Sequence, residues 1–585
     1  MNKIATVILC CLVGGLFCFN ILAATEYKHG PDSERHDGVP VGRIEKFKFT
    51  SPKIFAGTQR DCAIYIPAQY DGKEPAAVMV FQDGIGYTSE KGDWRIPIVF
   101  DNLIHKKDMP TTIGVFVNPG TLSIGDDKKV APRVNRSYEY DTPSDQYVRF
   151  LMDEILPYVE KEFKLNLTKD GNMRGICGSS SGGIAAFTAA WERPNEFRRV
   201  ISTIGSFTSL HGGGNNYPSM IRKSEPRPIR VFLEEGTTDL NNFAGDWYLA
   251  NQEMLSALKY ANYEVAYEWR EGAHSGKHGA PLMPDMLRYV WKDFAKPVAT
   301  PVNTTQLISS VIIPGEGWQL VSEGHKFTEG PAVDADGIVY FTDIPNNKIH
   351  KIGLDGKVTV FASDTKSANG LMFGPDGKLY CCANGAKQIV AYDKNAKIEV
   401  IADGVESNDI CINAAGEIYF TEPTQKQIWH ISAGKREKKI VDKGLGFANG
   451  ITFTADQGQL IVADSQSPNL YLYKIETDGS LSHKQPYYIA HLPGNDGQSG
   501  ADGIRVDIQG RLFVATKLGV QMFDQSGRVA GILTKPQPGT LANLVFGGPK
   551  FDTLYVCAGN KIFKRKVNTT GANNWQSPII PQKQK

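Results

Sequence analysis

The chain has 585 residues, of which 41% are hydrophobic and 22% charged, and its formal net charge is +1. This length exceeds what one hydrophobic core supports, so two domains of roughly 250–270 residues each are expected. The nearly neutral charge argues against nucleic acid or an anionic membrane surface as a partner.

The first residues have the layout of a secretory signal peptide. Lys3 is followed by an apolar run over residues 4–19, and small side chains stand at Ala23 and Ala24. This order predicts a signal peptide over residues 1–24, and therefore an exported protein, periplasmic or secreted, with no membrane attachment after cleavage. A permanent membrane anchor is the alternative.

Between residues 25 and 294, apolar strand-like runs alternate with segments of helical periodicity. Strands are expected at 41–49, 60–67, 76–84, 112–120, 199–207, 229–236 and 264–272. A helix is expected over residues 144–163, with Ser144 as its N-cap. Continuous apolar strands alternating with helices predict a mostly parallel sheet covered on both faces.

A Gly-x-Ser-x-Gly motif is centred on Ser180, with Gly178 and Gly182 at its ends. The apolar strand MRGIC precedes the motif and an Ala-rich helix follows it. A strand, sharp turn and helix in this order present a serine on a strained turn above the sheet, and small residues prevent crowding there. We predict that Ser180 is a nucleophile.

A nucleophilic serine needs a base and an orienting acid, which α/β-hydrolases supply in the order Ser, acid, His. The loop after the strand IRVFLEEG offers Asp239 as the acid, with Glu235 and Asp246 as alternatives. The loop after EVAYEWREG offers His274 as the base, with His278 as the alternative.

An oxyanion hole is expected beside the nucleophile. One donor should be the backbone N–H of Ser181, and the second an N–H of the loop after VMVFQDG, at Gly84 or Ile85. Asp83 should then lie at the mouth of the site, where it binds a substrate hydroxyl or shapes the loop.

The motifs VFQDG, NRSYEYD, GSSSGG, DLNN and GAHSGKHG resemble the enterochelin-esterase and feruloyl-esterase group, which also contains acetyl-xylan esterases and mycolyltransferases. The resemblance covers roughly residues 40–293. It implies an α/β-hydrolase fold, a Ser-Asp-His triad and no cofactor in this half. Feruloyl, acetyl and siderophore esters all remain open as substrates.

Residues 295–312 lack periodicity and are expected to be a linker. A repeat follows over residues 313–567, in which a turn with Gly precedes a strand with an aromatic residue, and residues 568–585 form a tail. The turn glycines lie 39 to 52 residues apart, at Gly337, Gly377, Gly416, Gly458 and Gly510. With a sixth copy near Thr553, this period predicts an all-β propeller of six blades.

Similar polar residues recur in different repeats, at Glu329, Asn449 and Asp502, and the pair Asn408-Asp409 stands at a related position. Ligands from several blades converge at the channel of a propeller. Carboxylate and amide oxygens suit Ca²⁺ or another divalent ion.

The motifs EGP, ANG and ADGIRVD resemble the gluconolactonase, senescence-marker-protein and luciferin-regenerating family. The resemblance implies metal ligands at Glu329, Asn449 and Asp502, with Asp502 also the base and Asn408 in contact with substrate. Ca²⁺ is the expected ion, and Zn²⁺ or Mn²⁺ are alternatives. Some members carry an Arg where this chain has Glu406, which leaves an aldonolactone substrate open.

These features predict a carboxylic-ester hydrolase that cleaves feruloyl- or acetyl-type esters of carbohydrates, joined to a metal-dependent hydrolase of sugar lactones. One alternative makes the propeller a binding module without catalysis. Another makes the first domain a siderophore esterase. The oligomeric state is left open.

Overall fold

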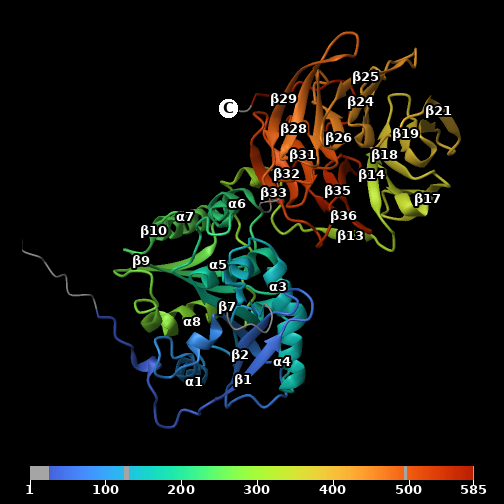
Figure 1. The fold of residues 1–585 in the computed structure, drawn as a ribbon. Helices are drawn as coiled ribbons and strands as arrows, with labels where there is room; N and C mark the ends of the chain where they lie inside the picture. The colour runs from blue at the N-terminus through green and yellow to red at the C-terminus, as the bar shows by residue number, and fades with distance from the viewer. Residues whose placement is uncertain (1–25, 124–130, 493–496, 584–585) are drawn as a thin grey trace, which may run out of the picture.

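The computed structural model describes residues 26–123, 131–492 and 497–583. The predicted signal peptide, residues 1–24, lies outside this range. Two units of different architecture follow each other along the chain, a layered α/β unit and a ring of small β-sheets (Figure 1). Within the described ranges, none of the helices is both long and apolar enough to cross a membrane.

The first unit is built on a ten-stranded sheet in the order β12-β9-β8-β7-β3-β4-β2-β5-β6, with β1 paired to β2. Strands β12, β9, β8, β7, β3 and β4 are parallel, whereas β1 and β2 run antiparallel at one side. The strands are β1 (Arg43–Thr50), β2 (Gln59–Ile66), β3 (Ala77–Gln82), β4 (Thr112–Val117), β5 (Thr121–Leu122), β6 (Arg133–Val134), β7 (Arg174–Ser179), β8 (Arg199–Thr203), β9 (Arg230–Gly236) and β12 (Glu264–Arg270).

Helices cover both faces of this sheet and form two separate apolar cores. One core contains side chains of α3 (Gln146–Phe150), α4 (Leu156–Glu162), α5 (Ser181–Glu192) and α7 (Trp247–Tyr260). The other contains side chains of α1 (Ile96–Lys106) and α8 (Met283–Trp291). The predicted α/β-hydrolase class, with a mostly parallel sheet between two helical layers, is confirmed.

The helix expected over residues 144–163 is interrupted. A π-helical turn, Leu151–Ile155, separates α3 from α4, and Ser144 does not cap the helix, which begins at Gln146. Pro157 lies in the first turn of α4 and has no N–H to donate back along the helix, which accounts for the wider turn before it.

The second unit is a six-bladed propeller, as predicted. Five blades are consecutive antiparallel sheets, and the sixth is ordered β13-β36-β35-β34. Blades one to six contain, in this order, β14 (Thr328–Val333) to β17 (Val358–Ser363), β18 (Ala368–Phe373) to β21 (Ile398–Asp403), β22 (Ile410–Ile412) to β25 (Lys438–Lys443), β26 (Ala448–Phe453) to β29 (Leu481–Ile489), β30 (Ile504–Val506) to β33 (Val529–Leu533), and β34 (Asn543–Gly547) to β36 (Lys561–Lys566) with β13 (Gln319–Ser322). The strand β13 thus closes the ring by pairing with the last strand, β36.

The segment between the units contains only a short 3₁₀ turn, Leu307–Ser310, but it is held in place. Val298 is buried at the first unit, where its N–H donates to the side chain of Asn172. Ile308 and Val311 are fully buried in a core of the propeller. The predicted linker is therefore packed against both units.

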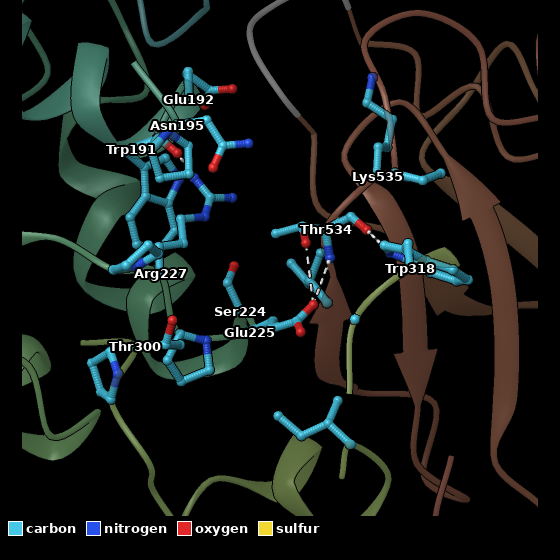
Figure 2. Close-up of a pocket in the computed structure, with 18 of the residues that line it drawn as sticks. Trp191, Glu192, Asn195, Ser224, Glu225, Arg227, Thr300, Trp318, Thr534 and Lys535 are labelled. Atoms are coloured by element: carbon cyan, nitrogen blue, oxygen red, sulfur yellow. Dashed lines mark hydrogen bonds between the residues drawn. The ribbon is translucent and has the colours of Figure 1, made fainter. Parts of the chain in front are cut away.

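The two units also meet directly. Glu225 accepts hydrogen bonds from Arg565 at 2.9 and 3.0 Å and from Thr534, and Ser224 bridges Ile532 of β33. Beside this contact lies a cleft of about 1400 Å³, in which Trp191 and Trp318 line opposite sides (Figure 2). The cleft lies at the far end of α5 from Ser180, because that helix begins at Ser181 and ends at Glu192.

All six cysteines outside the predicted signal peptide are buried free thiols, so the described residues contain no disulfide. They are Cys62, Cys177, Cys381, Cys382, Cys411 and Cys557.

Candidate functional site

Ser180 occupies the sharp turn between β7 and α5. Its backbone has φ 60° and ψ −124°, a conformation that L-residues rarely adopt. The turn is fixed by hydrogen bonds from Ser180 N–H to Thr203 O at 2.9 Å and from Gly183 N–H to Ser180 O at 2.9 Å. A Cβ on Gly178 would lie 2.3 Å from Gly182 O, so the first position of the motif admits only glycine.

The structure brings Ser180, His274 and Asp239 into one chain of hydrogen bonds. His274 Nε2 lies 2.8 Å from Ser180 Oγ, and His274 Nδ1 lies 2.7 Å from Asp239 Oδ1. Asp239 and His274 come from the loops that follow the parallel strands β9 and β12, which end at the same edge of the sheet as β7. This is the geometry of a serine nucleophile with its base and orienting acid.

The alternatives that the sequence left open have other contacts. His278 is buried beside Glu234, which lies 2.5 Å from its Nδ1, and its Nε2 lies 2.9 Å from Ala273 O. Asp246 caps α7 by accepting the N–H of Leu249. Neither side chain is part of the chain of hydrogen bonds that ends at the nucleophile.

The third alternative, Glu235, lies directly beside the acid. Burial, followed by the interaction with Asp239, raises the pKa of Glu235 to about 11, so this carboxyl is protonated at neutral pH. Burial opposes ionisation of Asp239 as well, but hydrogen bonds from His274 and Glu235 lower the pKa of Asp239. Asp239 Oδ2 has no other partner within the described chain, which fits a proton shared with Glu235.

The two predicted oxyanion-hole donors differ in their contacts. No acceptor contacts the N–H of Ser181 among the described residues, so it remains available. The N–H of Ile85 instead donates to Asn118 Oδ1 at 3.1 Å. A substrate oxygen that accepts the N–H of Ile85 would therefore compete with the side chain of Asn118, a residue that sequence reasoning missed.

Asp83, expected at the mouth of the site, is engaged by Arg136. The guanidinium donates to Asp83 Oδ1 at 3.0 Å and to Oδ2 at 2.7 Å, and both side chains are about one-third exposed. Asp83 also has φ 53°, so it shapes the turn between β3 and the following 3₁₀ turn. Of the two roles expected for Asp83, the loop-shaping role is the one with visible contacts.

Two further side chains at the nucleophile were not predicted in these roles. Ser206 Oγ lies 3.2 Å from Ser180 Oγ, and the indole N–H of Trp247 donates to Ser206 at 3.0 Å. Trp247 also packs edge-on against the ring of His274. If the Ser180 hydroxyl donates to His274, then Ser206 is the donor in its contact with Ser180.

A second cluster of polar residues lies inside the propeller, where the first strands of the blades face one another. Glu329 and Asn449 are buried, and Asp502 interacts with both of them. Asp409 is buried against Glu329 and Asp502, and Asn543 donates to Glu329 Oε2 at 2.9 Å. The three predicted ligands are thus brought together, and Asn543 is an unpredicted neighbour.

The carboxyl groups of this cluster repel one another. Burial raises the pKa of Glu329, and the charge of Asp409 adds to the shift. Burial likewise raises the pKa of Asp502, with Glu329 and Asp409 contributing. Burial raises the pKa of Asp409 too, although Arg505 opposes the shift. One arginine does not neutralise three desolvated carboxylates.

This cluster fits a hard divalent cation. Its donors are carboxylate and amide oxygens, and Asp409 Oδ2 is buried without a hydrogen-bond partner in the described chain. Asn408, the predicted substrate contact, is partly buried next to Asp409, and its backbone joins blades two and three through Gly370. Glu406 pairs with Lys387 at 2.7 Å.

Comparison with known proteins matches part of each half of the chain to a different family model. Residues 54–287 match a family described as putative esterase, and residues 327–560 match the SMP-30/gluconolactonase/LRE-like region. A gluconolactonase of Zymomonas mobilis is 24% identical over 298 residues, covering 43% of this chain and 82% of the relative. The pentonolactonase XacC of Haloferax volcanii is 23% identical over 253 residues, covering 41% of this chain and 83% of the relative.

Among solved structures, the enterobactin esterase of Shigella flexneri is similar to 46% of this chain and 63% of its own, with 19% identity and a TM-score of 0.35. The two family matches confirm the resemblances predicted from the motifs. The chain therefore carries a region that matches an esterase family and a propeller that matches a gluconolactonase-like family, and the two matches support a hydrolase with ester or lactone activity.

Proposed function

We propose that this chain is an exported hydrolase with two independent sites. The first domain cleaves feruloyl- or acetyl-type esters of carbohydrates by acyl-enzyme chemistry, and the propeller hydrolyses a sugar lactone with the help of a divalent cation. The observation that carries the proposal is the unbroken series of hydrogen bonds from Ser180 Oγ through His274 to Asp239, with lengths of 2.8 and 2.7 Å.

In the ester half, His274 Nε2 takes the proton of Ser180 Oγ as that oxygen attacks the ester carbonyl. Asp239 holds the imidazole in the tautomer that leaves Nε2 free to accept this proton. The N–H of Ser181 donates to the oxygen on which negative charge develops. His274 then protonates the leaving alcohol, and a water molecule activated by His274 hydrolyses the acyl-enzyme, which restores Ser180.

Asn118 and Ser206 have opposite effects on the ester reaction: Asn118 occupies an oxyanion donor, whereas Ser206 supports the nucleophile. Because the N–H of Ile85 is bound to Asn118, Ile85 can serve as the second oxyanion donor when substrate replaces that carboxamide. Ser206 lies against the attacking oxygen, where its hydroxyl can hold Ser180 Oγ in place before the attack. The hydrogen bond from Ser180 to His274 is thus already formed, whereas the N–H of Ile85 is still bound to Asn118 and has yet to meet substrate.

In the propeller, Glu329, Asn449 and Asp502 would hold the cation, and Ca²⁺ is the ion that their oxygen donors favour. When bound, such an ion polarises a lactone carbonyl. Asp502 accepts a proton from the attacking water, and Asn408 orients the sugar ring. The names of the curated relatives, a gluconolactonase and a pentonolactonase, support a sugar lactone as substrate.

The first test separates the two sites by substitution. Ser180→Ala should lower kcat for an aryl acetate or methyl ferulate by about 10⁶-fold, because the nucleophile is lost, while lactone hydrolysis stays unchanged. Full ester turnover by this variant would overturn the serine assignment. Ester and siderophore substrates in one panel then decide between a carbohydrate esterase and a siderophore esterase.

The second test removes the cation. Dialysis against EDTA should abolish lactone hydrolysis, and added Ca²⁺ should restore it, with ester cleavage constant throughout. Asp502→Asn should lower the lactone rate by roughly 100-fold or more. If neither treatment alters any lactone rate, the propeller is a binding module and the lactonase proposal fails. Export is tested by fractionating cells that produce the full chain.

A further inference from the structure

A group of two histidines and one aspartate lies in the first blade, away from the oxygen-rich centre of the propeller. One ligand atom each from His325, Asp343 and His350 lies within 4.8 Å of the others. The His325 side chain is 8% exposed and the Asp343 side chain 2%, and His350 is 9% exposed. The group is therefore a largely dehydrated cluster of nitrogen and oxygen donors.

The imidazole of His325 is oriented for ligation. Its Nε2 lies 2.7 Å from Ser322 Oγ, so Nδ1 is the nitrogen that faces Asp343. The distance from Nδ1 to Asp343 Oδ2 is 3.3 Å, which matches the edge of a tetrahedron with metal–ligand bonds of about 2.0 Å. A metal-binding histidine usually donates its other ring N–H to an oxygen acceptor, and Ser322 Oγ would accept it here.

The second imidazole has no role in an ordinary ion pair between His325 and Asp343. The ring of His350 stacks on Phe341 and meets the ring of His325 edge-on, with centroids 4.9 Å apart. Its Nε2 is buried and has no hydrogen-bond partner in the described chain. A buried ring nitrogen without a partner is costly unless something binds it.

The other blades show what Asp343 does without the histidines. An acid at the same place, Glu422 in blade three and Asp464 in blade four, accepts the backbone N–H before the first strand, as Asp343 accepts that of Phe327. Capping of that backbone is thus a shared structural role. The two histidines belong to blade one alone among these three blades and need a separate explanation.

Other residues occupy the positions of His325 and His350 in blades three and four. The strand register places Trp429 of blade three where blade one has His350, and Trp429 stacks on Phe420 and donates to Glu422 at 2.7 Å. Blade four has Leu445 where blade one has His325, counted from the capped N–H. Blade three satisfies its acid with an indole, whereas blade one presents two imidazoles.

From this geometry we propose that His325, Asp343 and His350 bind one Zn²⁺ ion that fastens the ring closure of the propeller. Two imidazoles and one carboxylate suit Zn²⁺ and not Ca²⁺, which prefers six or more oxygens. Ser322 ends the closing strand β13, and His325 lies four residues before Glu329. The ion would therefore tie the closing strand to blade one and hold the segment that leads to Glu329.

The full chain is first treated with a chelator and then saturated with Ca²⁺. Zn²⁺ is titrated into it by calorimetry, and the absorption spectrum of bound Co²⁺ is a second readout. The wild type should bind one Zn²⁺ and show tetrahedral Co²⁺ bands. His350→Trp, which copies blade three, and His325→Leu, which copies blade four, should each weaken Zn²⁺ binding by more than about 100-fold. Ser322→Ala, which keeps all three ligands, should weaken it by about 10-fold.

Two controls complete the design. His483→Gln removes an exposed histidine on β29 and should leave the Zn²⁺ titration unchanged. Glu329→Gln alters the oxygen-rich site and should also leave it unchanged, because the proposed Zn²⁺ ion does not bind at that site. Zn²⁺ should also raise the unfolding temperature of the wild type but not of His350→Trp. Equal Zn²⁺ affinity in the wild type and in folded His350→Trp, or no binding by the wild type, would overturn the proposal.

Discussion

The two candidate sites of this molecule differ in how complete they are. In the esterase domain, each charge and proton has a partner: Asp239 is held by His274 and by a protonated Glu235, and His274 reaches Ser180. In the propeller, Glu329, Asp409 and Asp502 are buried together with one arginine nearby. The side chains of the first site satisfy one another, whereas the buried carboxyl groups of the second repel one another and are relieved either by protonation or by a bound cation.

The largest expected effect tests whether the esterase site is as complete as it looks. Asp239→Asn should lower kcat for ester hydrolysis by about 10⁴-fold, because an amide favours the wrong tautomer of His274. The matched control is Glu235→Gln, which keeps a hydrogen-bond donor beside Asp239 and should leave kcat close to that of the wild type. A larger loss in Glu235→Gln than in Asp239→Asn would make Glu235 the orienting acid.

The next effect concerns the excess charge of the propeller. The raised pKa of Asp409 means that the folded state holds this proton more tightly than the unfolded state does. The proton on Asp409 therefore stabilises the folded state fully below the ordinary carboxyl pKa of about 4. This stabilisation is lost as the pH rises through the raised pKa of Asp409 in the folded state. The melting temperature of the metal-free chain should fall as the pH is raised to neutrality.

Asp409→Asn should flatten this fall, measured as the difference from the wild type in a series of melting curves. A pKa shift of one unit corresponds to about 1.4 kcal/mol. In a domain as large as the propeller, this free energy changes the melting temperature by roughly 3–6 °C. Saturating Ca²⁺ should flatten the wild-type curve in the same way. A wild-type curve that falls equally steeply with and without Ca²⁺ would show that no cation relieves the repulsion.

The smallest effect tests whether the two sites communicate. Glu225→Gln removes the charge that pairs with Arg565 across the interface and should cost about 1 kcal/mol of coupling between the units. Two separate transitions should then appear in calorimetry, with ester and lactone rates both unchanged. The control Asp552→Asn weakens the more exposed pair with Lys566 and should leave one transition. A change in either rate would reveal coupling between the sites.

Much of the esterase site could be predicted because its signals are local. The elbow at Ser180 is a short motif, and Asp239 and His274 each follow an apolar strand that could be recognised. Glu235 was weighed only as a rival acid, because sequence does not show that it is buried and protonated. Asn118 was missed because its contact with Ile85 depends on how two loops meet.

The number of blades of the propeller could be predicted from the repeat length, but the contacts among its interior residues could be predicted less well. Glu329, Asn449 and Asp502 stand in recurring motifs, so they could be found by comparing repeats. Asn543 lies in the one repeat that lost its turn glycine, which removed the landmark. His325 and His350 are 25 residues apart with no metal-type spacing. Only the pairing of β15 (Val339–Asp343) with β16 (Lys348–Ile352) brings Asp343 and His350 together.

The closing strand β13 has a consequence for how the chain is made. It is synthesised first among the propeller strands, yet its partner β36 is synthesised last, with more than 230 residues between them. The blade that joins the ends of the ring can therefore form only after translation of the whole second unit, while the sheet of the first unit is already complete. Such a long-range pairing folds slowly. The esterase domain should therefore fold first, and the propeller should remain open and exposed until its last strand is synthesised.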